Sequence, residues 1–267
     1  MTIPLFHVDA FTERPFAGNP AAVCVLPAAR SDRWQQAVAR EMNLSETSFL
    51  IKQPDHFGLR WFTPTTEVDL CGHATLAAAH VLWQQNYADP AQSIRFSTRS
   101  GILSAVLRGN RIELDFPLKP EEPATPPEGL IEALGISPVY TGRNQFDYLV
   151  EVESESVVRR MSPDFKRLAA VRARGVIVTS RAAEPPYDFV SRFFAPASGI
   201  DEDPVTGSAH CCLGAYWRKR LNKTEFLAYQ ASSRGGVVRV QVTDGRVLLA
   251  GCAVIVAHGT LLVDADA

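Results

Sequence analysis

The chain has 267 residues, with 27 basic and 29 acidic side chains, a formal net charge of −2 and 46% hydrophobic residues. This composition suits a packed globular protein of one large domain or two modest ones, and no basic run suits a nucleic-acid backbone or an anionic membrane. No apolar stretch approaches the roughly 20 residues of a membrane span, and the N-terminus lacks the layout of a secretory signal. We therefore expect a cytoplasmic protein that binds neither nucleic acid nor membrane.

The first half of the chain is predicted to alternate strands with two helices. Residues 32–42 are expected to form a helix with Ser31 as its N-cap, and residues 72–85 a second helix because of their Ala and Leu content. The Pro-rich residues 117–129 indicate a linker. Strands are expected at residues 3–8, 21–26, 48–51, 59–63, 93–96, 102–107 and 111–116.

Beyond the linker the same kinds of pattern return. Helices are expected at residues 130–134 and 163–171. Strands are expected at residues 148–152 and 176–179, with two more between 248 and 263 around a turn at residues 258–259.

The two sides of the linker share a repeat. The run from Trp61 to Pro64, an acidic turn and Gly72 match the run from Phe193 to Pro196, an acidic turn and Gly207. Each copy reads as an aromatic strand, a proline turn, a glycine and a helix of small residues. The repeat predicts two similar domains that face one another across a cleft, with boundaries at 1–118 and 128–257.

The starts of the two small-residue helices are candidate anion sites, because unpaired N–H groups and the helix dipole favour negative charge there. His73 follows Gly72 at the first start, where it either donates to a substrate oxygen or acts as a cap or core residue. Asp203 and Ser208 flank the second start, where the structural alternative is an Asp turn and an N-cap around Gly207.

Two further side chains could take part in proton transfer. Glu46 lies in a polar interruption between a helix and a strand, and is either an acid/base or a solvated loop residue. Cys71 could act as a thiolate base at the helix start, but a two-base racemase needs a partner, and the second copy offers no cysteine before Gly207.

Cofactor and metal signatures are missing from the sequence. There is no nucleotide-binding, phosphate-binding, serine-hydrolase or zinc-protease motif, so proton transfer at an activated C–H is the chemistry that the side chains can run unaided. The odd number of cysteines indicates reduced thiols, and none has the spacing of a structural zinc site. We expect neither cofactor nor metal. The cysteines are Cys24, Cys71, Cys211, Cys212 and Cys252.

Four motifs, in order and spread over nearly the whole chain, resemble the PhzF-like family of phenazine biosynthesis: residues 7–12 with 16–23, residues 43–47, residues 71–75 and residues 203–210. The resemblance implies an α+β fold similar to that of diaminopimelate epimerase, with two pseudo-symmetric domains, each a curled β-sheet or barrel around a central helix. The active site would lie between the domains, residues 258–267 would return to the first domain, and the protein would be a homodimer.

The best-understood member of that family isomerises trans-2,3-dihydro-3-hydroxyanthranilate with one glutamate and no cofactor. Carried over by motif, the resemblance makes Glu46 the proton shuttle on a small carboxylated substrate, with His73 and Asp203 as its polar partners. Three further residues would bind substrate oxygens or the carboxylate: Gly72, Gly207 and Ser208.

The resemblance also bears on the alternatives. It aligns Cys71 with the first catalytic thiol of the epimerases and replaces the second thiol by the segment Asp203-Pro204. An amino-acid epimerase or racemase using Cys71 therefore stays an alternative, as does a small-molecule-binding protein that kept the fold and lost the chemistry.

Overall fold

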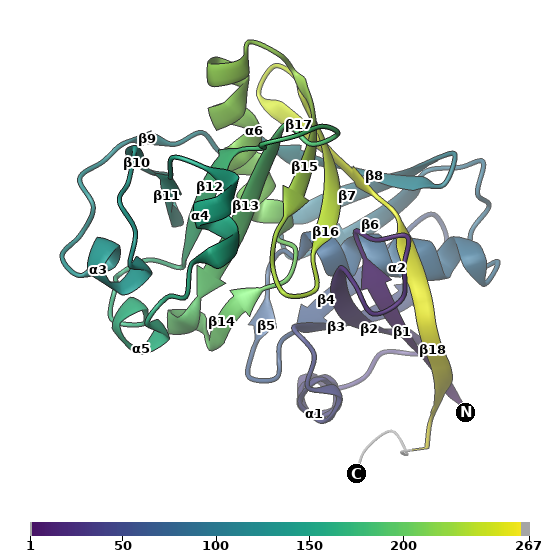
Figure 1. The fold of residues 1–267 in the computed structure, drawn as a ribbon. Helices are drawn as coiled ribbons and strands as arrows, with labels where there is room; N and C mark the ends of the chain where they lie inside the picture. The colour runs from purple at the N-terminus through teal and green to yellow at the C-terminus, as the bar shows by residue number, and fades with distance from the viewer. Residues whose placement is uncertain (1, 263–267) are drawn as a thin grey trace. The chain divides into compact units, whose positions relative to one another are not determined.

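The computed structural model describes residues 2–262, which form two compact units (Figure 1). The first comprises residues 2–115 and 250–262, and the second residues 116–249. The division falls within the strands β8 (Arg111–Pro117) and β17 (Arg246–Gly251). No helix in residues 2–262 has the length and apolar character needed to cross a membrane.

The first unit is a curved sheet around helix α2. Its strands pair in the order β18, β1, β2, β3, β4, β6, β7 and β8, and all neighbours are antiparallel except β2 with β3 and β4 with β6. Apart from β8, the strands and helices of this unit have the following bounds: β1 (Ile3–Ala10), β2 (Asn19–Leu26), α1 (Asp32–Met42), β3 (Glu46–Lys52), β4 (Phe57–Phe62), β5 (Glu67–Val68), α2 (Gly72–Gln84), β6 (Ile94–Thr98), β7 (Gly101–Arg108) and β18 (Ala253–Leu261).

The second unit repeats this arrangement around helix α6. Its strands pair in the order β9, β10, β11, β12, β13, β15 and β16, again with two parallel neighbours, β11 with β12 and β13 with β15. The elements are β9 (Glu122–Pro123), α3 (Leu130–Leu134), β10 (Tyr140–Arg143), β11 (Asp147–Glu151), α4 (Glu155–Arg160), α5 (Phe165–Leu168), β12 (Gly175–Arg181), β13 (Phe189–Ala195), a 3-10 turn (Pro196–Ser198), β14 (Ile200–Asp203), α6 (Gly207–Leu221), β15 (Glu225–Gln230) and β16 (Gly236–Val242).

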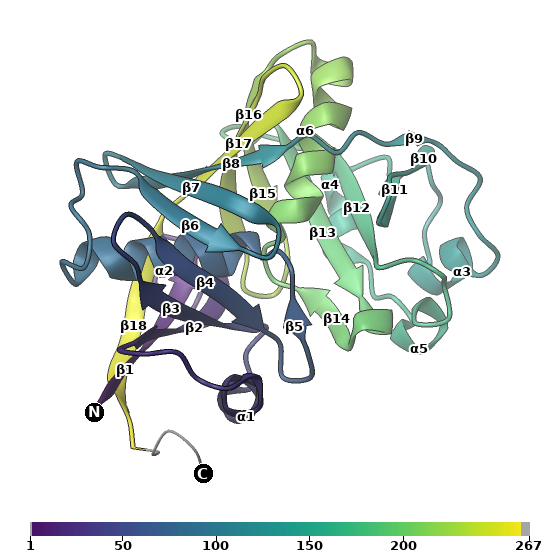
Figure 2. The same cartoon turned by 180° about the vertical axis from the view of Figure 1, so that it is seen from behind.

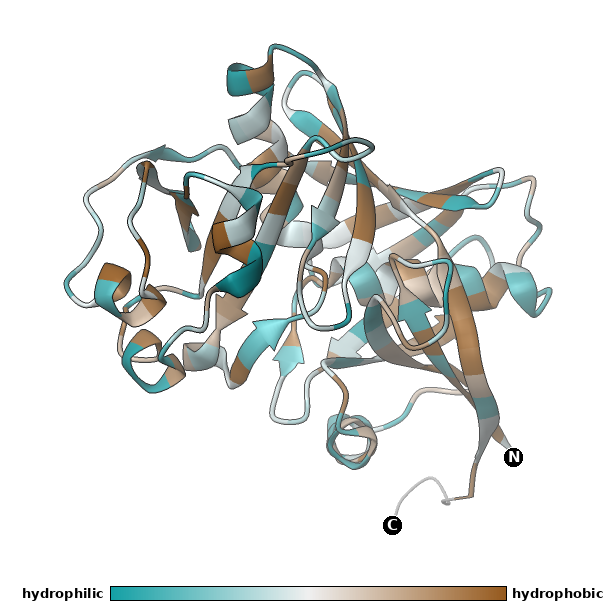
Figure 3. Cartoon of the chain, viewed as in Figure 1, coloured by the Kyte–Doolittle hydropathy of each residue, from teal (hydrophilic) through white to brown (hydrophobic). Residues whose placement is uncertain are grey.

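The registers of the two sheets confirm the repeat residue by residue. In the first unit Thr47 pairs with Phe62, and in the second Val176 pairs with Phe194. The two expected acidic turns are in fact short strands, β5 and β14, which pair back onto β4 and β13. In Figure 3 both short strands carry polar colour, and within the second unit β14 contrasts with the more apolar β12 and β13.

One ion pair marks the repeat in each unit. Arg60 on β4 binds both carboxylate oxygens of Glu67, at 2.7 and 2.6 Å, and Arg192 on β13 binds both of Glu202, at 2.7 and 2.8 Å. Such bidentate pairs fix both the position and the orientation of the two side chains. Each pair ties a short acidic strand to its aromatic strand, immediately before the central helix.

The central helices are buried on all sides, and small residues make up much of each of them. Every residue from His73 to Ala79 is buried, as is every residue from Ala209 to Trp217. Helix α2 packs against β1, β2 and β3 in the first unit (Figure 1), and α6 lies along the sheet of the second (Figure 2), where Trp217 Nε1 donates to Thr179 Oγ1 on β12 at 3.1 Å. The sequence prediction of an α+β fold with a curled sheet around a central helix is confirmed.

The linker prediction is wrong. Residues 118–124 are bound to the second unit: Leu118 N donates to Gly245 O at 3.0 Å, Lys119 N donates to Cys211 O at 3.3 Å, and β9 pairs with β10. Glu121 is only 4% exposed. The prolines misled the interpretation, since proline is accepted in an edge strand such as β9, where its missing N–H costs no ladder bond.

Two other expected elements differ from the structure. The helix expected at 163–171 is the single turn α5, with Asp164 as its N-cap. The turn expected at His258 and Gly259 does not exist, because both lie inside β18, opposite Phe6 and Leu5 of β1. The described residues end at 262. They therefore leave out residue 263 of the second expected strand and residues 263–267 of the segment expected to return to the first domain.

Candidate active site

Glu46 is the first residue of β3 and reaches the start of α2. Helix α1 ends at Met42, and the left-handed backbone of its C-cap residue Asn43 (φ 50°) turns the chain within two residues into β3. Glu46 pairs with Ala21 of the parallel strand β2, so its side chain lies on the face of the sheet that α2 covers, as Ser48 shows by donating to Ala74 O at 3.1 Å. The side chain is 14% exposed. The solvated-loop interpretation of Glu46 is therefore wrong.

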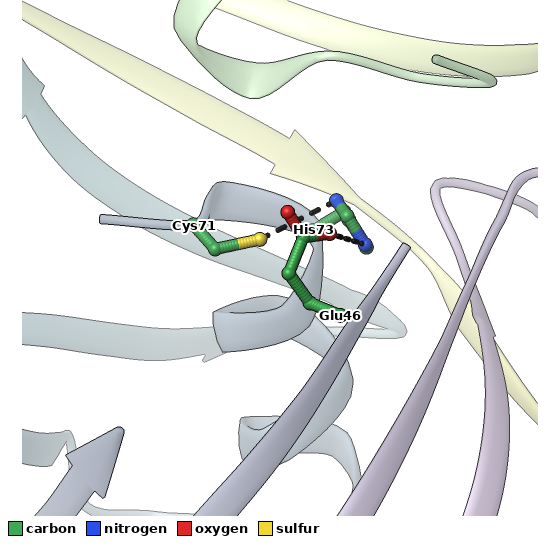
Figure 4. Close-up of side chains that lie close together, drawn as sticks. All are labelled: Glu46, Cys71 and His73. Carbon is green, nitrogen blue, oxygen red and sulfur yellow. Dashed lines mark hydrogen bonds and ion pairs between the residues drawn. The ribbon is translucent and has the colours of Figure 1, made fainter. Parts of the chain in front are cut away.

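His73, the second residue of α2, meets Glu46 directly (Figure 4). Its Nε2 lies 3.2 Å from Glu46 Oε2, and its side chain is 5% exposed. The N-cap position belongs to Cys71, so His73 is not a capping residue. The ring and the carboxylate therefore form a close pair of titratable groups at the start of α2.

The other nitrogen of the ring faces two different donors. Nδ1 lies 3.1 Å from Nδ2 of Asn19, which is fully buried, and 3.5 Å from Cys71 Sγ. An amide nitrogen can only donate, so Nδ1 accepts and the neutral ring carries its proton on Nε2, toward Glu46. Asn19 is a site residue that the residue-by-residue reasoning missed, although it lies in the motif of residues 16–23.

The loop before Asn19 holds it in place. Gly18 has φ +66°, and a Cβ at this position would come within 2.1 Å of Ala10 O. Phe16 N donates to Asp9 Oδ2 at 2.7 Å. Only glycine fits the close approach of the two backbones, so the Gly-Asn sequence delivers the Asn19 amide to the histidine ring.

Burial and charge act in opposite directions on the titrating groups. Burial alone would lower the pKa of His73, but the Cys71 sulfur, which can accept from the protonated ring, and the negative charge of Glu46 raise it well above its ordinary value. Burial raises the pKa of Cys71 to about 11, so this thiol keeps its proton at neutral pH. A thiolate base at Cys71 is therefore disfavoured by its surroundings.

The same three side chains are the only described group of this kind that could hold a metal ion, with ligand atoms all within 4.8 Å of one another. Glu46 and Cys71 nevertheless approach different nitrogens of the His73 ring, and one metal can bind only one of them. The Cys71 thiol would also have to lose its proton. The arrangement suits hydrogen bonding better than metal ligation.

In the second unit, Asp203 ends β14 and belongs to a polar network before α6. Thr206 Oγ1 donates to Asp203 Oδ2 at 2.5 Å, and Gln230 Nε2 donates to Asp203 O at 2.7 Å. Thr206 is the N-cap, and its side chain makes no capping bond to the helix. The alternative interpretation of Ser208 as an N-cap is wrong, because Ser208 is the second residue of α6, after Gly207.

The register also corrects the alignment of the second thiol. Thr206 and Cys71 both precede the glycine that starts the central helix, so Thr206, and not the segment Asp203-Pro204, occupies the place equivalent to Cys71. By the same register Ser208 is the counterpart of His73. The structure brings Glu46, Cys71 and His73 together in the first unit, and Asp203, Gly207 and Ser208 near one another in the second.

Comparisons with known proteins decide the family. A family model described as phenazine biosynthesis-like protein matches residues 8–259. The chain belongs to this family. Among its PhzF relatives, an uncharacterized isomerase of Halalkalibacterium halodurans is 57% identical over 263 residues, covering 98% of this chain and 99% of that protein. An uncharacterized isomerase of Pseudomonas aeruginosa is 48% identical over 261 residues, with the same coverage.

Solved structures agree with this assignment. The crystal structure of a phenazine biosynthesis protein of the PhzF family from Enterococcus faecalis has a TM-score of 0.94 and 41% identity, covering 98% of this chain and 100% of that one. A hydroxyproline epimerase from Agrobacterium vitis, only 10% identical, has a TM-score of 0.65 over 97% of this chain and 92% of its own, and shows the shared epimerase-like fold. The expectation that this PhzF-like chain is an isomerase is confirmed.

Proposed function

We propose that the protein is a cofactor-independent isomerase that moves a proton on a small carboxylated substrate, similar to dihydrohydroxyanthranilate, with Glu46 as the acid/base. The observation that carries this proposal is the contact of 3.2 Å between Glu46 Oε2 and His73 Nε2 at the start of α2. Glu46 takes a proton from carbon and returns it to another carbon on the same face, while His73 holds the carboxylate by its Nε2–H.

The second unit supports a mechanism with one base. By the register, Gly175 stands where the first unit has Glu46, because Gly175 pairs with Asp147 of β11 as Glu46 pairs with Ala21 of β2. A Cβ at Gly175 would lie 2.2 Å from Phe193 Cζ, so an aromatic ring occupies the space that a second carboxylate would need. The repeat therefore provides a single glutamate.

We propose further that Asp203 is a polar partner in the proton transfer, and that Ser208 and the backbone N–H groups of Gly72 and Gly207 bind substrate oxygens. The uncapped start of α6 supports this, because its first N–H groups are not taken by the Thr206 side chain. The family resemblance also supports a homodimer in the cytoplasm, and light scattering on the purified protein tests the dimer.

The epimerase alternative depends on Cys71. The raised pKa of this thiol, and the threonine at the equivalent place in the second unit, both argue against a pair of thiol bases. The alternative is kept as an outcome of the test below.

The test is deuterium incorporation from D2O, followed by NMR, on dihydrohydroxyanthranilate and a panel of related carboxylates. We expect label with the wild type and a rate at least about a hundredfold lower with Glu46→Gln, since a positioned general base contributes roughly that much. Glu41→Gln removes the same charge from an exposed position of α1 and should exchange normally.

Cys71→Ala separates the two enzymatic alternatives in the same assay. Label with this variant supports the glutamate base, whereas loss of label with Cys71→Ala and retention with Glu46→Gln would establish the epimerase instead. Absence of both label and isomerised product from every compound would favour the small-molecule-binding protein.

A further inference from the structure

The second unit has a polar pair of its own at the start of its central helix, although Gly175 takes the place of Glu46. Ser208 occupies the place of His73, and Arg174, directly before Gly175 at the start of β12, lies next to it. Arg174 Nη2 donates to Ser208 Oγ at 3.1 Å. A cation and a hydroxyl thus meet at the start of α6, where the first unit has a carboxylate and an imidazole at the start of α2.

Arg174 is held rigidly by a buried partner. Its Nε and Nη2 donate to the two carboxylate oxygens of Asp147 at 2.9 and 2.5 Å, and the Asp147 side chain is 0% exposed. The guanidinium carbon also lies 5.0 Å from the ring of Phe146 and 5.8 Å from that of Phe193. Such a clamp fixes the plane of the guanidinium before any ligand arrives.

The clamp leaves part of the guanidinium free for a ligand. Arg174 Nη1 makes no hydrogen bond to any residue in the described part of the chain, and the side chain is 40% exposed. Ser208 accepts from Arg174, so its own hydroxyl proton can be donated elsewhere. Three kinds of donor are thus available at this place: the N–H groups of Arg174 Nη1, the Ser208 hydroxyl and the uncapped N–H groups of α6. A carboxylate only accepts hydrogen bonds, so it suits a site made of donors.

We propose that Arg174, positioned by Asp147, recognises the carboxylate of the substrate together with Ser208. This inference rests on the proposed function for the nature of the substrate and adds the cation that selects it. The sequence did not indicate Arg174, because this residue lies outside every motif, in the turn before a strand. Only the sheet register relates it to the first unit.

The test compares equilibrium binding of 2-aminobenzoate and 2-aminobenzamide, which share a ring and an amine and differ in the carboxylate. Fluorescence titration of the whole chain should show at least about tenfold tighter binding of the acid by the wild type, as a charge-assisted hydrogen bond allows. Arg174→Met should lose this preference, with affinity for the amide changed less than about twofold.

Two further variants make the result decisive. Arg174→Met leaves a buried carboxylate without its partner, so the variant Arg174→Met/Asp147→Asn, which removes both charges, is titrated beside it and should lose the preference equally. Arg172→Met removes the same charge from an exposed residue two positions earlier and should keep the preference.

The proposal is overturned if the wild type binds the acid no better than the amide or binds neither, if both Arg174 variants keep the preference, or if Arg172→Met loses it as well. Binding requires no turnover. A preserved preference for the acid, together with neither deuterium label nor isomerised product from any carboxylate, would therefore overturn the proposed function and leave the role of Arg174 intact.

Discussion

The ring of His73 meets a different kind of neighbour on each nitrogen. Nε2 faces the Glu46 carboxylate at 3.2 Å, whereas Nδ1 faces the donors Asn19 and Cys71. A catalytic glutamate must exchange its proton with carbon and not lose it to a neighbour. A ring that already has its proton on Nε2 turns a polar N–H toward the carboxylate and cannot accept a proton from it at that nitrogen.

The raised pKa of His73 gives the folding stability a specific dependence on pH. A histidine whose pKa is raised in the folded state contributes stability that is complete below about pH 6.5, its unfolded value, and is lost as the pH rises through the folded pKa. We compare the free energies of unfolding of the wild type and His73→Gln. The advantage of the wild type should fall by about 1.4 kcal/mol per pH unit from about pH 6.5 up to the folded pKa of His73.

Urea unfolding at several pH values measures this difference, and His80 provides the control. Burial lowers the pKa of His80, so the difference between the wild type and His80→Gln should rise with pH up to about 6.5 and then stay level. A difference for His73→Gln that is flat or rises with pH would contradict the assignment.

At the scale of the elements, the hairpin of β13 and β14 delivers Asp203 to the start of α6. Arg192 fastens this hairpin through both oxygens of Glu202 and through Met161 O at 2.8 Å, and its side chain is 12% exposed. Removing one partner of an ion pair so little exposed leaves the other charge poorly solvated.

Arg192→Met should therefore lower the free energy of unfolding by about 2 kcal/mol. The matched control is Arg95→Met, because Arg95 is 53% exposed and its Nη1 lies 3.5 Å from Asp55 Oδ2. An exposed pair of this kind contributes within about 0.5 kcal/mol. Equal losses for the two variants in urea unfolding would show that the hairpin does not depend on the Arg192 pair.

The sequence predicts those elements best whose signals are local. Helix α1 has the predicted bounds, with Trp34 N donating to Ser31 Oγ at 3.2 Å, and α3 also has its predicted bounds. β9 and the continuous β18 could not be predicted, because each depends on a partner strand that is remote in sequence. Likewise, Glu46 and His73 were assigned roles by resemblance, since no local pattern shows that α2 buries them together.

At the scale of the whole molecule, the same order of paired strands occurs twice, with different side chains at equivalent positions. Both units have the same order of parallel and antiparallel pairs and the same Arg and Glu clasp, yet the place of Glu46 is taken by Gly175 in the second unit. The ring of Phe193 fills the space in front of Gly175 and lies beside the Arg174 guanidinium. The equivalent positions of the two units have therefore diverged, with a glutamate in the first and a glycine beside an arginine in the second.

A double-mutant cycle at Gly175 and Phe193 tests whether the ring is what excludes a side chain there. Gly175→Ala should cost about 2 kcal/mol, because the new Cβ would collide with Phe193 Cζ, and Phe193→Leu about 1 kcal/mol for the lost packing. The double variant should cost at least about 1 kcal/mol less than the sum, since the smaller side chain makes room for the Cβ.

Gly58→Ala is the control, because its Cβ would lie 3.8 Å from its nearest neighbour, Ile51 O. Its cost should be additive with that of Phe193→Leu. Strict additivity at Gly175 in urea unfolding would mean that the ring does not close this position, and that the absence of a second carboxylate has another cause.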